Sequence, residues 1–248
     1  MPKLTPLLLS INVDHVATLR NARGGRFPDP IAAAQICLGA GAEGITMHLR
    51  EDRRHIRDQD VERMKAEVPA LLNLEMAATE EMVGIALRLR PEAVCLVPEK
   101  RQELTTEGGL DVLNAGPALG EAVRRLTGAG IRTSIFVEAD PAQIEGAARI
   151  GANCVELHTG AYADASAAQR PALLARLAAG ARAAAGQGLA CHAGHGLDFG
   201  CIGGIAALPD VSEVSIGHFL ISQSLFEGLP SAVRRMRSLI DEARNAPC

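Results

Sequence analysis

A cluster of acid–base and cationic side chains follows the apolar run Gly44–Met47. Two histidines and three arginines lie within the next eight residues, and His48, Arg50 and His55 are the most informative of them. Because side chains alternate along a strand, His48 and Arg50 point to the same side of the strand end. Imidazole and guanidinium groups in that position suit proton transfer beside a bound anion. The other arginines of this stretch alternate with acids, which is typical of a solvated loop.

Carboxylates interrupt other apolar runs. Glu75 and Glu156 each lie inside one, where a buried charge is costly unless it has a partner or a task. Loss of solvation raises the pKa of such a carboxyl group, which suits a general acid or base. A buried ion pair with an arginine inside the fold is an equally open interpretation. Asp14 beside His15 could orient that ring or cap the following turn, and Glu99 could pair locally with the two cations that follow it.

Glycines indicate a first anion site. Gly194-His195-Gly196 and Gly217-His218 each end an apolar run. At such places backbone N–H groups and the start of a helix can hold a phosphate. Arg23, in the basic segment 20–26, is a further anion-binding candidate, with a solvated basic turn as the alternative.

A second anion site is indicated by Arg50 and His55, with Thr105 positioned to close over it from the long segment 102–114. Long loops in compact domains often close over substrates, and Gly108-Gly109 offers a hinge. Two anion sites that flank several acid–base groups predict either one bisphosphate or two phosphorylated substrates that are joined.

Eight short apolar runs, each followed by a helical segment, must position these groups. The expected strands are Leu7–Asn12, Gly44–Met47, Leu71–Ala77, Ala93–Pro98, Arg132–Glu138, Cys154–Leu157, Leu189–Ala193 and Val214–Ile216. Runs without clean alternation favour strands buried on both faces of a parallel sheet. Eight such units in 248 residues predict one domain, 1–248, with the (β/α)8 TIM barrel fold.

All seven histidines lie at or beside the expected strand ends, and none lies in an expected helix. They are His15, His48, His55, His158, His192, His195 and His218. Active sites of such barrels lie at the carboxyl ends of the strands. A lone histidine is more often structural, but seven on one face favour a shared site.

Composition excludes several functional classes. A net charge of −4 and 2% aromatic residues argue against a general nucleic-acid binder. No apolar run is long enough to span a bilayer, and the chain does not open with a signal peptide. The six cysteines form no C-x-x-C pair, so we interpret them as reduced residues of a cytoplasmic protein rather than as a metal site.

Seven motifs, spread over nearly the whole chain in one register, resemble the pyridoxine 5′-phosphate synthase family. They are Asn12–Arg23, His48–Ile56, Asn73–Ala77, Leu96–Glu103, Glu156–Gly160, Ala193–Leu197 and Ile216–His218. The resemblance implies that 1-deoxy-D-xylulose 5-phosphate and 3-amino-2-oxopropyl phosphate condense to pyridoxine 5′-phosphate, phosphate and water. It also implies a barrel that uses no metal or other cofactor, assembles as a homo-octamer and closes the loop after its fourth strand over the substrates.

The resemblance also implies roles for individual residues. His48 and Glu75 would accept protons, His195 would donate one, and Glu156 would stabilise charge in the transition state. The amino-ketone phosphate would be bound by Asn12, Arg23, Gly196, Gly217 and His218. The deoxyxylulose phosphate would be bound by Asp14, His15, Arg50, His55 and Thr105.

One position departs from the family pattern, because His192 stands where asparagine is expected. An extra imidazole beside His195 could alter the pKa of that residue, so fine tuning is in doubt rather than the reaction. Three rival functions remain open on the residues alone. They are a phosphosugar epimerase or isomerase with one anion site, a metal-dependent barrel hydrolase, and a barrel that binds phosphorylated ligands without catalysis.

Overall fold

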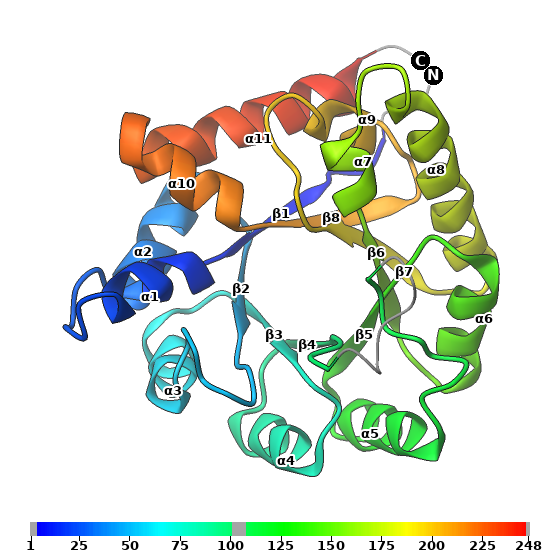
Figure 1. Cartoon of the computed structure of the whole chain (residues 1–248), viewed down its shortest axis with the longest axis horizontal. Helices are drawn as coiled ribbons and strands as arrows, with labels where there is room; N and C mark the ends of the chain where they lie inside the picture. Colours follow the sequence, from blue (N-terminus) through cyan, green and yellow to red (C-terminus); the bar gives the residue numbers. More distant parts are fainter. Residues whose placement is uncertain (1–3, 101–107, 247–248) are drawn as a thin grey trace.

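Eight parallel strands form a closed barrel at the centre of the protein, seen in a computed structural model that describes residues 4–100 and 108–246 (Figure 1). The strands are β1 Leu8–Asn12, β2 Gly44–His48, β3 Leu71–Met76, β4 Ala93–Leu96, β5 Arg132–Val137, β6 Cys154–His158, β7 Ala190–Gly194 and β8 Val211–Ile216. Each strand pairs with the next along the chain, and β8 closes the barrel against β1. The predicted (β/α)8 fold is confirmed.

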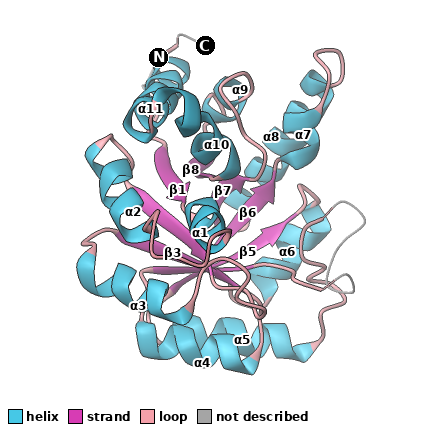
Figure 2. Cartoon of the chain, turned by 60° about the vertical axis from the view of Figure 1, so that its left-hand side comes forward, coloured by secondary structure: helices cyan, strands magenta, loops and turns pink. Residues whose placement is uncertain are grey.

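Helices surround the barrel on its outside, as Figures 1 and 2 show from two directions. They are α1 Asp14–Asn21, α2 Pro30–Gly39, α3 Asp58–Glu67, α4 Glu80–Leu89, α5 Pro117–Gly128, α6 Pro141–Arg149, α7 Gly160–Asp164, α8 Arg170–Gly186, α9 Ile202–Ala206, α10 His218–Glu227 and α11 Leu229–Asn245. In the described part of the chain, no helix is both long and apolar enough to cross a membrane.

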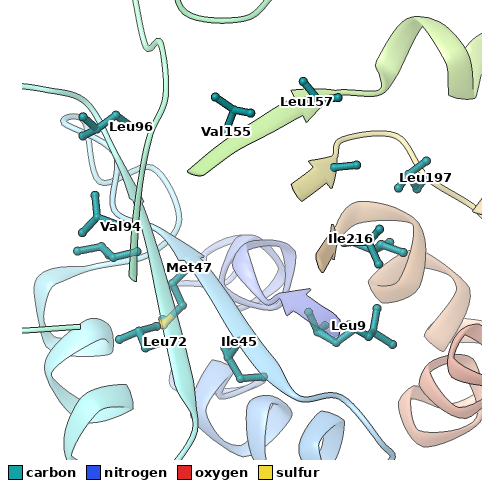
Figure 3. Packing of buried hydrophobic residues seen from close by; sticks show 14 of the residues in the cluster. Leu9, Ile45, Met47, Leu72, Val94, Leu96, Val155, Leu157, Leu197 and Ile216 are labelled. Atoms are coloured by element: carbon teal, nitrogen blue, oxygen red, sulfur yellow. The ribbon is translucent and has the colours of Figure 1, made fainter. Parts of the chain in front are cut away.

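The two faces of the strands carry different side chains. Leu9, Ile45, Leu72, Val94 and Val155 belong to the buried apolar core (Figure 3). Within each strand, the residues that alternate with these apolar ones are mostly polar and face the barrel interior. Burying each large apolar side chain contributes about 1.5–3 kcal/mol, so the apolar layer stabilises the barrel while its interior remains available for polar groups.

The interior is polar even below the strand ends. The hydroxyl of Thr46 lies 2.8 Å from Ser10 Oγ and accepts a hydrogen bond from Ser215 Oγ at 3.3 Å. Arg132 on β5 donates across the barrel to Glu213 on β8, which is not a neighbouring strand, at 3.0 Å. Buried polar groups need such partners, so each one fixes the orientation of another.

Three expected helix starts are confirmed by their caps. Asp29 Oδ1 accepts the N–H of Ile31 at 3.1 Å, and Asp140 Oδ1 accepts that of Ala142 at 3.0 Å. Thr79 caps α4 in the same way. A proline follows each of the two aspartates at the first helical position, where its missing N–H costs nothing.

The prediction that no histidine lies in a helix was wrong for two of them. His15 lies in the first turn of α1, and His218 is the first residue of α10. Neither helix has a long apolar stripe that would have indicated it. In α1 the inward residue Arg20 is charged, and it is buried because Asp60 of α3 pairs with both of its terminal nitrogens, at 2.6 and 2.9 Å.

Thr105, and the first part (102–107) of the segment that was expected to close over the site, lie outside the described residues.

Candidate active site

A cavity of about 740 Å³ lies where the carboxyl ends of the strands meet, as expected for this fold. Its walls are formed by Asn12, Asp14, His15, His48, Arg50, His55, Glu75, Val97, Pro98, Gly108, Phe136, Glu156, His158, His195, Gly196, Ser215, Gly217 and His218. The structure thus brings together all the candidate site residues that it describes except Arg23. Phe136 and Ser215 were not predicted, since isolated residues of these types carry no sequence signal.

Asp14 connects the first two strands at the cavity. Its Oδ1 accepts the backbone N–H of His48 at 2.8 Å, and its Oδ2 accepts the side-chain amide of Asn12 at 2.9 Å. The Asn12 side chain in turn accepts the N–H of Asp14 at 2.9 Å. Burial raises the pKa of Asp14 to about 6, although these hydrogen bonds and the charge of His48 oppose the rise. The start of α1 therefore fixes the backbone of His48.

His48 lies between two carboxyl groups. Its Nε2 is 2.9 Å from Glu99 Oε1, and its Nδ1 is 3.8 Å from Glu75 Oε2. The other oxygen of Glu99 accepts the backbone N–H of Glu51 at 3.0 Å. Burial opposes ionisation of Glu99, but the hydrogen bonds from His48 and Glu51 outweigh it and lower the pKa. The interpretation of Glu99 as a locally paired residue missed these contacts with the end of β2.

Glu75 and Glu156 are titratable groups inside the cavity. Burial, followed by the charges of Glu156 and Asp14, raises the pKa of Glu75 well above its usual range. Burial also raises the pKa of Glu156 to about 8, with Glu213 adding to the rise. Two such carboxyl groups cannot both be ionised at neutral pH. The alternative of a buried arginine partner applies to Glu213 and not to these two, among the described contacts.

His55 offers a donor to the cavity. Its Nδ1 accepts the N–H of Ile56 at 2.9 Å, so the proton of the neutral ring is on Nε2. Burial, and then the charges of His48 and Arg50, lower its pKa to about 4. Within the described chain, Nε of Arg50 is buried and makes no hydrogen bond, although Asp52 Oδ1 is 3.5 Å away. This pair is therefore equipped to receive an anion.

The loop that carries His55 is anchored by α1. Its backbone carbonyl accepts hydrogen bonds from Arg20 at 3.1 Å and from the side-chain amide of Asn21 at 2.9 Å. Arg20 is itself held by its two-pronged contact with Asp60. The solvated-turn interpretation of the basic segment 20–26 is therefore wrong for Arg20, while Arg23 lies in an exposed turn outside the cavity wall.

The first predicted anion site, at Gly217 and His218, lies at the amino end of α10. Gly217 precedes the helix, and a Cβ there would lie 2.9 Å from Cβ of Asn12, so only glycine fits. The rings of His15 and His218 meet edge to face with 4.8 Å between centroids. His15 Nδ1 is buried and has no hydrogen-bond partner among the described residues. Free N–H groups at the start of a ten-residue helix attract negative charge.

A further pair of imidazoles forms the opposite wall. His158 Nδ1 is 2.7 Å from Glu138 Oε1, and the centroids of His158 and His195 are 5.1 Å apart. Burial, and then the charge of His158, lower the pKa of His195. Thr159 Oγ1 donates to the carbonyls of Gly194 and His195, both at 2.6 Å, which fixes the turn that presents His195.

His158 and Glu138 had no assigned role in the sequence interpretation. The available signal was their position, because each stands at or just after the end of a strand, like the residues that were assigned.

Among the described ring contacts, the imidazole paired with His195 is that of His158 and not that of His192. His192 is 4% exposed, is in register with Glu156 and lies with its Nε2 3.9 Å from Glu213 Oε2. It is not part of the cavity wall. Burial lowers its pKa. The imidazole that influences His195 belongs to His158.

One group among the described residues has the spacing of a cation site. Ligand-type atoms of Asp14, His48 and Glu75 all lie within 4.8 Å of one another. The two carboxyl groups have raised pKa values, and a protonated carboxyl is a poor metal ligand. Neighbouring carboxyl groups raise each other's pKa wherever no cation lies between them, so the same spacing also suits a cation.

Comparison with known proteins agrees with the site. Residues 9–242 match the family model described as "Pyridoxal phosphate biosynthesis protein PdxJ". The chain is 56% identical to a pyridoxine 5′-phosphate synthase of Rhodopseudomonas palustris (strain HaA2), over 98% of each chain. It is 58% identical to that of Xanthobacter autotrophicus, over 99% of this chain and 97% of the relative.

Solved structures with low sequence identity share the fold. A 3-hexulose-6-phosphate synthase from Salmonella typhimurium superimposes with a TM-score of 0.64 at 12% identity, covering 96% of this chain and all of that one. A phosphoribosyl anthranilate isomerase from Thermus thermophilus gives a TM-score of 0.58 at 14% identity, covering 95% and 99% of the two chains. At such identities the likeness shows the barrel architecture alone.

Proposed function

The chain belongs to the pyridoxine 5′-phosphate synthase family, and we propose that it joins 1-deoxy-D-xylulose 5-phosphate to 3-amino-2-oxopropyl phosphate. The products would be pyridoxine 5′-phosphate, inorganic phosphate and water. One observation carries the proposal: a single cavity of about 740 Å³ holds acid–base groups between two regions suited to anions. Binding both phosphates there would turn a bimolecular encounter into an oriented one.

The acid–base groups would divide the work between the two walls. His48 and Glu75 would accept protons from the joined intermediate, and His195 would donate one. The lowered pKa of His195 makes its protonated form a stronger acid, which suits giving a proton up. Glu156 would stabilise charge in the transition state. Imine formation, loss of phosphate and ring closure each move protons, so several such groups are needed together.

Protonation of the carboxyl pair would change when the amine arrives. In the ligand-free cavity, burial raises the pKa of Glu75 and so favours its protonated form. A protonated amine or iminium ion beside it would favour the carboxylate, because an opposite charge nearby lowers the pKa. Glu75 would thus become a base only once the amino substrate or its adduct is present.

The two anion regions would each bind one phosphate. The region at α10 would take the amino-ketone phosphate, and the region of the second strand end would take the deoxyxylulose phosphate. The first set is Asn12, Arg23, Gly196, Gly217 and His218, and the second is Asp14, His15, Arg50, His55 and Thr105. Unpartnered buried nitrogens of His15 and Arg50 support binding by the described members of the second set.

We also propose a homo-octamer in the cytoplasm. Phe27 and Phe226 are both 85% exposed and Leu225 is 71% exposed, which fits surfaces that meet another copy. The described cysteines are free and buried, which suits a reducing compartment. Light scattering of purified protein would measure the mass of the assembly.

The decisive assay mixes the purified protein with both phosphates and measures pyridoxine 5′-phosphate and released phosphate. Both products should appear only when both substrates are present. An epimerase or isomerase would convert one phosphate alone, and a binding protein would release no phosphate. Absence of pyridoxine 5′-phosphate from the complete mixture would contradict the proposal.

The spacing of Asp14, His48 and Glu75 favours one rival, a metal-dependent reaction. Elemental analysis and treatment with a chelator separate the two functions. The synthase proposal expects turnover that is unaffected by chelation. Stoichiometric zinc whose removal abolishes turnover would favour the rival.

A further inference from the structure

We propose that Glu99 is a positioning residue that fixes the tautomer of His48, so that an unprotonated Nδ1 faces the substrates. The proposal rests on the synthase function, in which His48 accepts a proton. It adds a residue that lies outside the cavity wall and acts through another side chain.

The geometry around Glu99 allows one proton arrangement. Its Oε2 faces two groups that can only donate, the backbone N–H of Glu51 at 3.0 Å and the Arg50 guanidinium at 3.8 Å. Its Oε1 lies 2.9 Å from His48 Nε2. The side chain is 4% exposed, so water offers little competition. A carboxylate accepts at both oxygens, and the proton of the neutral imidazole must therefore be on Nε2.

The other nitrogen of His48 is left for chemistry. Nδ1 lies on the side of Glu75, whose Oε2 is 3.8 Å away and forms part of the cavity wall. The backbone of His48 is held by Asp14. The ring is thus fixed through both its backbone and its Nε2, as expected of a base that must be preorganised.

Charged and titratable groups surround His48 on every side that packs against it. They are Asp14 from α1, Arg50 and His55 from the loop after β2, Glu75 from β3 and Glu99 after β4. Of these, Glu99 alone lies within hydrogen-bond distance of a ring nitrogen among the described contacts. The tautomer therefore depends chiefly on Glu99.

An amide at position 99 should reverse the tautomer. In Glu99→Gln the amide has one acceptor oxygen and one donor nitrogen. The N–H of Glu51 cannot become an acceptor, so the amide oxygen should occupy the position of Oε2. The amide nitrogen then faces His48 Nε2 and donates to it. The imidazole proton moves to Nδ1, and His48 no longer presents a base to the cavity.

The experiment compares Glu99→Gln with Glu51→Gln and with the unmodified enzyme. Glu51 is a matched control because its side chain pairs with Lys100 at 3.3 Å, whereas its described contact with Glu99 is made by its backbone N–H. We expect kcat of Glu99→Gln to fall by about 10²- to 10⁴-fold with little change in KM. Glu51→Gln should keep its activity.

Nitrogen-15 NMR of histidine-labelled protein supplies a readout that a merely structural role would not move. The His48 signal, assigned by its loss in His48→Gln, should show the proton on Nε2 in the unmodified enzyme and on Nδ1 in Glu99→Gln. Unchanged turnover in a folded Glu99→Gln protein, or an unchanged tautomer, would overturn the proposal.

Two further outcomes keep the test decisive. If Glu99→Gln does not fold, the unmodified enzyme still decides, because a proton on its Nδ1 overturns the proposal. Glu99→Asp, which keeps a charged acceptor, should then retain the Nε2–H form. If the unmodified enzyme makes no pyridoxine 5′-phosphate, the synthase function fails, whereas the tautomer result stands independently.

Discussion

Two carboxylate–imidazole pairs face the same cavity from opposite walls, and they hold their rings by different nitrogens. Glu99 contacts Nε2 of His48, whereas Glu138 contacts Nδ1 of His158. The nitrogen left over is Nδ1 in the first ring and Nε2 in the second. The same two residue types therefore present opposite tautomers to the substrates. The carboxylate after β4 contacts Nε2 of His48, and the carboxylate after β5 contacts Nδ1 of His158.

The neighbours of the two rings also differ. His48 has the carboxyl group of Glu75 3.8 Å from its Nδ1, which is too long for a hydrogen bond but close enough for opposite charges to attract. His158 has His195 beside it, with 5.1 Å between ring centroids. Two imidazolium ions at that distance would repel each other. The first wall, formed by His48 and Glu75, can hold a proton on either group. The second wall, formed by His158 and His195, can carry only one positive charge at a time.

The largest expected effect comes from removing the pair on the first wall. His48→Ala and Glu75→Ala should each lower kcat by about 10²- to 10⁴-fold, because each removes a proton acceptor. Rapid-quench measurement of pyridoxine 5′-phosphate formation would give the rate.

Binding separates this effect from misfolding. Each variant should still bind at least one of the two phosphates in calorimetry, because Arg50 and His55 remain in place. Near-normal turnover in either variant would remove that residue from the mechanism.

A second difference, in charge, separates two of the buried carboxyl groups. The lowered pKa of Glu99 favours its ionised form at neutral pH, whereas the raised pKa of Glu156 favours its protonated form. Burial raises the pKa of Glu156 to about 8, while the unfolded chain ionises near its usual value of about 4.5. Between these values the folded state binds one more proton, so stability falls as pH rises. Glu156→Gln should remove a slope on the order of 1 kcal/mol per pH unit.

Thermal unfolding of both proteins from pH 5 to pH 9 would measure this slope. The variant should gain stability relative to the unmodified enzyme as pH rises, and the difference should level off above pH 8. A constant difference across the range would show that Glu156 is ionised in the folded protein.

Local patterns predicted most of the barrel and most of the cavity wall. Apolar runs, glycine breaks and Asp-Pro caps are contained in short segments, so the strands and the helices that start at Pro30 and Pro141 could be read directly. The strand-end histidines followed from the fold, because parallel strands bring their carboxyl ends to one face.

Contacts between distant segments could not be predicted in this way. Glu99 and His48 are 51 positions apart, and their contact exists only because β2, β3 and β4 lie side by side. The burial of Arg20 depends likewise on Asp60, 40 positions away. The tautomer of His48 depends on this contact, which no spacing in a sequence encodes.

A smaller effect is expected from Glu138→Gln on the second wall. Here one oxygen, Oε1, receives both His158 Nδ1 at 2.7 Å and the N–H of Gly109 at 3.2 Å. An amide oxygen can occupy that position and accept from both, so the tautomer should not change. Loss of the negative charge should still disfavour protonation of His158. We expect kcat to fall by about tenfold, equal to about 1.4 kcal/mol of barrier.

The NMR signal of His158 distinguishes the two walls. It should keep its proton on Nδ1 in Glu138→Gln, unlike His48 in Glu99→Gln. A reversed tautomer, or a loss as large as that of Glu99→Gln, would erase the difference between the walls.

The smallest effect is expected at His192, which is not part of the cavity wall. Its described ion pair is with Glu213 and with neither tautomer pair, and the 3.9 Å between Nε2 and Oε2 is too long for a hydrogen bond. It is in register with Glu156, which, unlike His192, forms part of that wall. His192→Asn should therefore keep kcat within about tenfold, or roughly 1.4 kcal/mol of barrier. A loss of several orders of magnitude in kcat would mean that proton transfer extends beyond Glu156 to His192. The two walls would then no longer act separately.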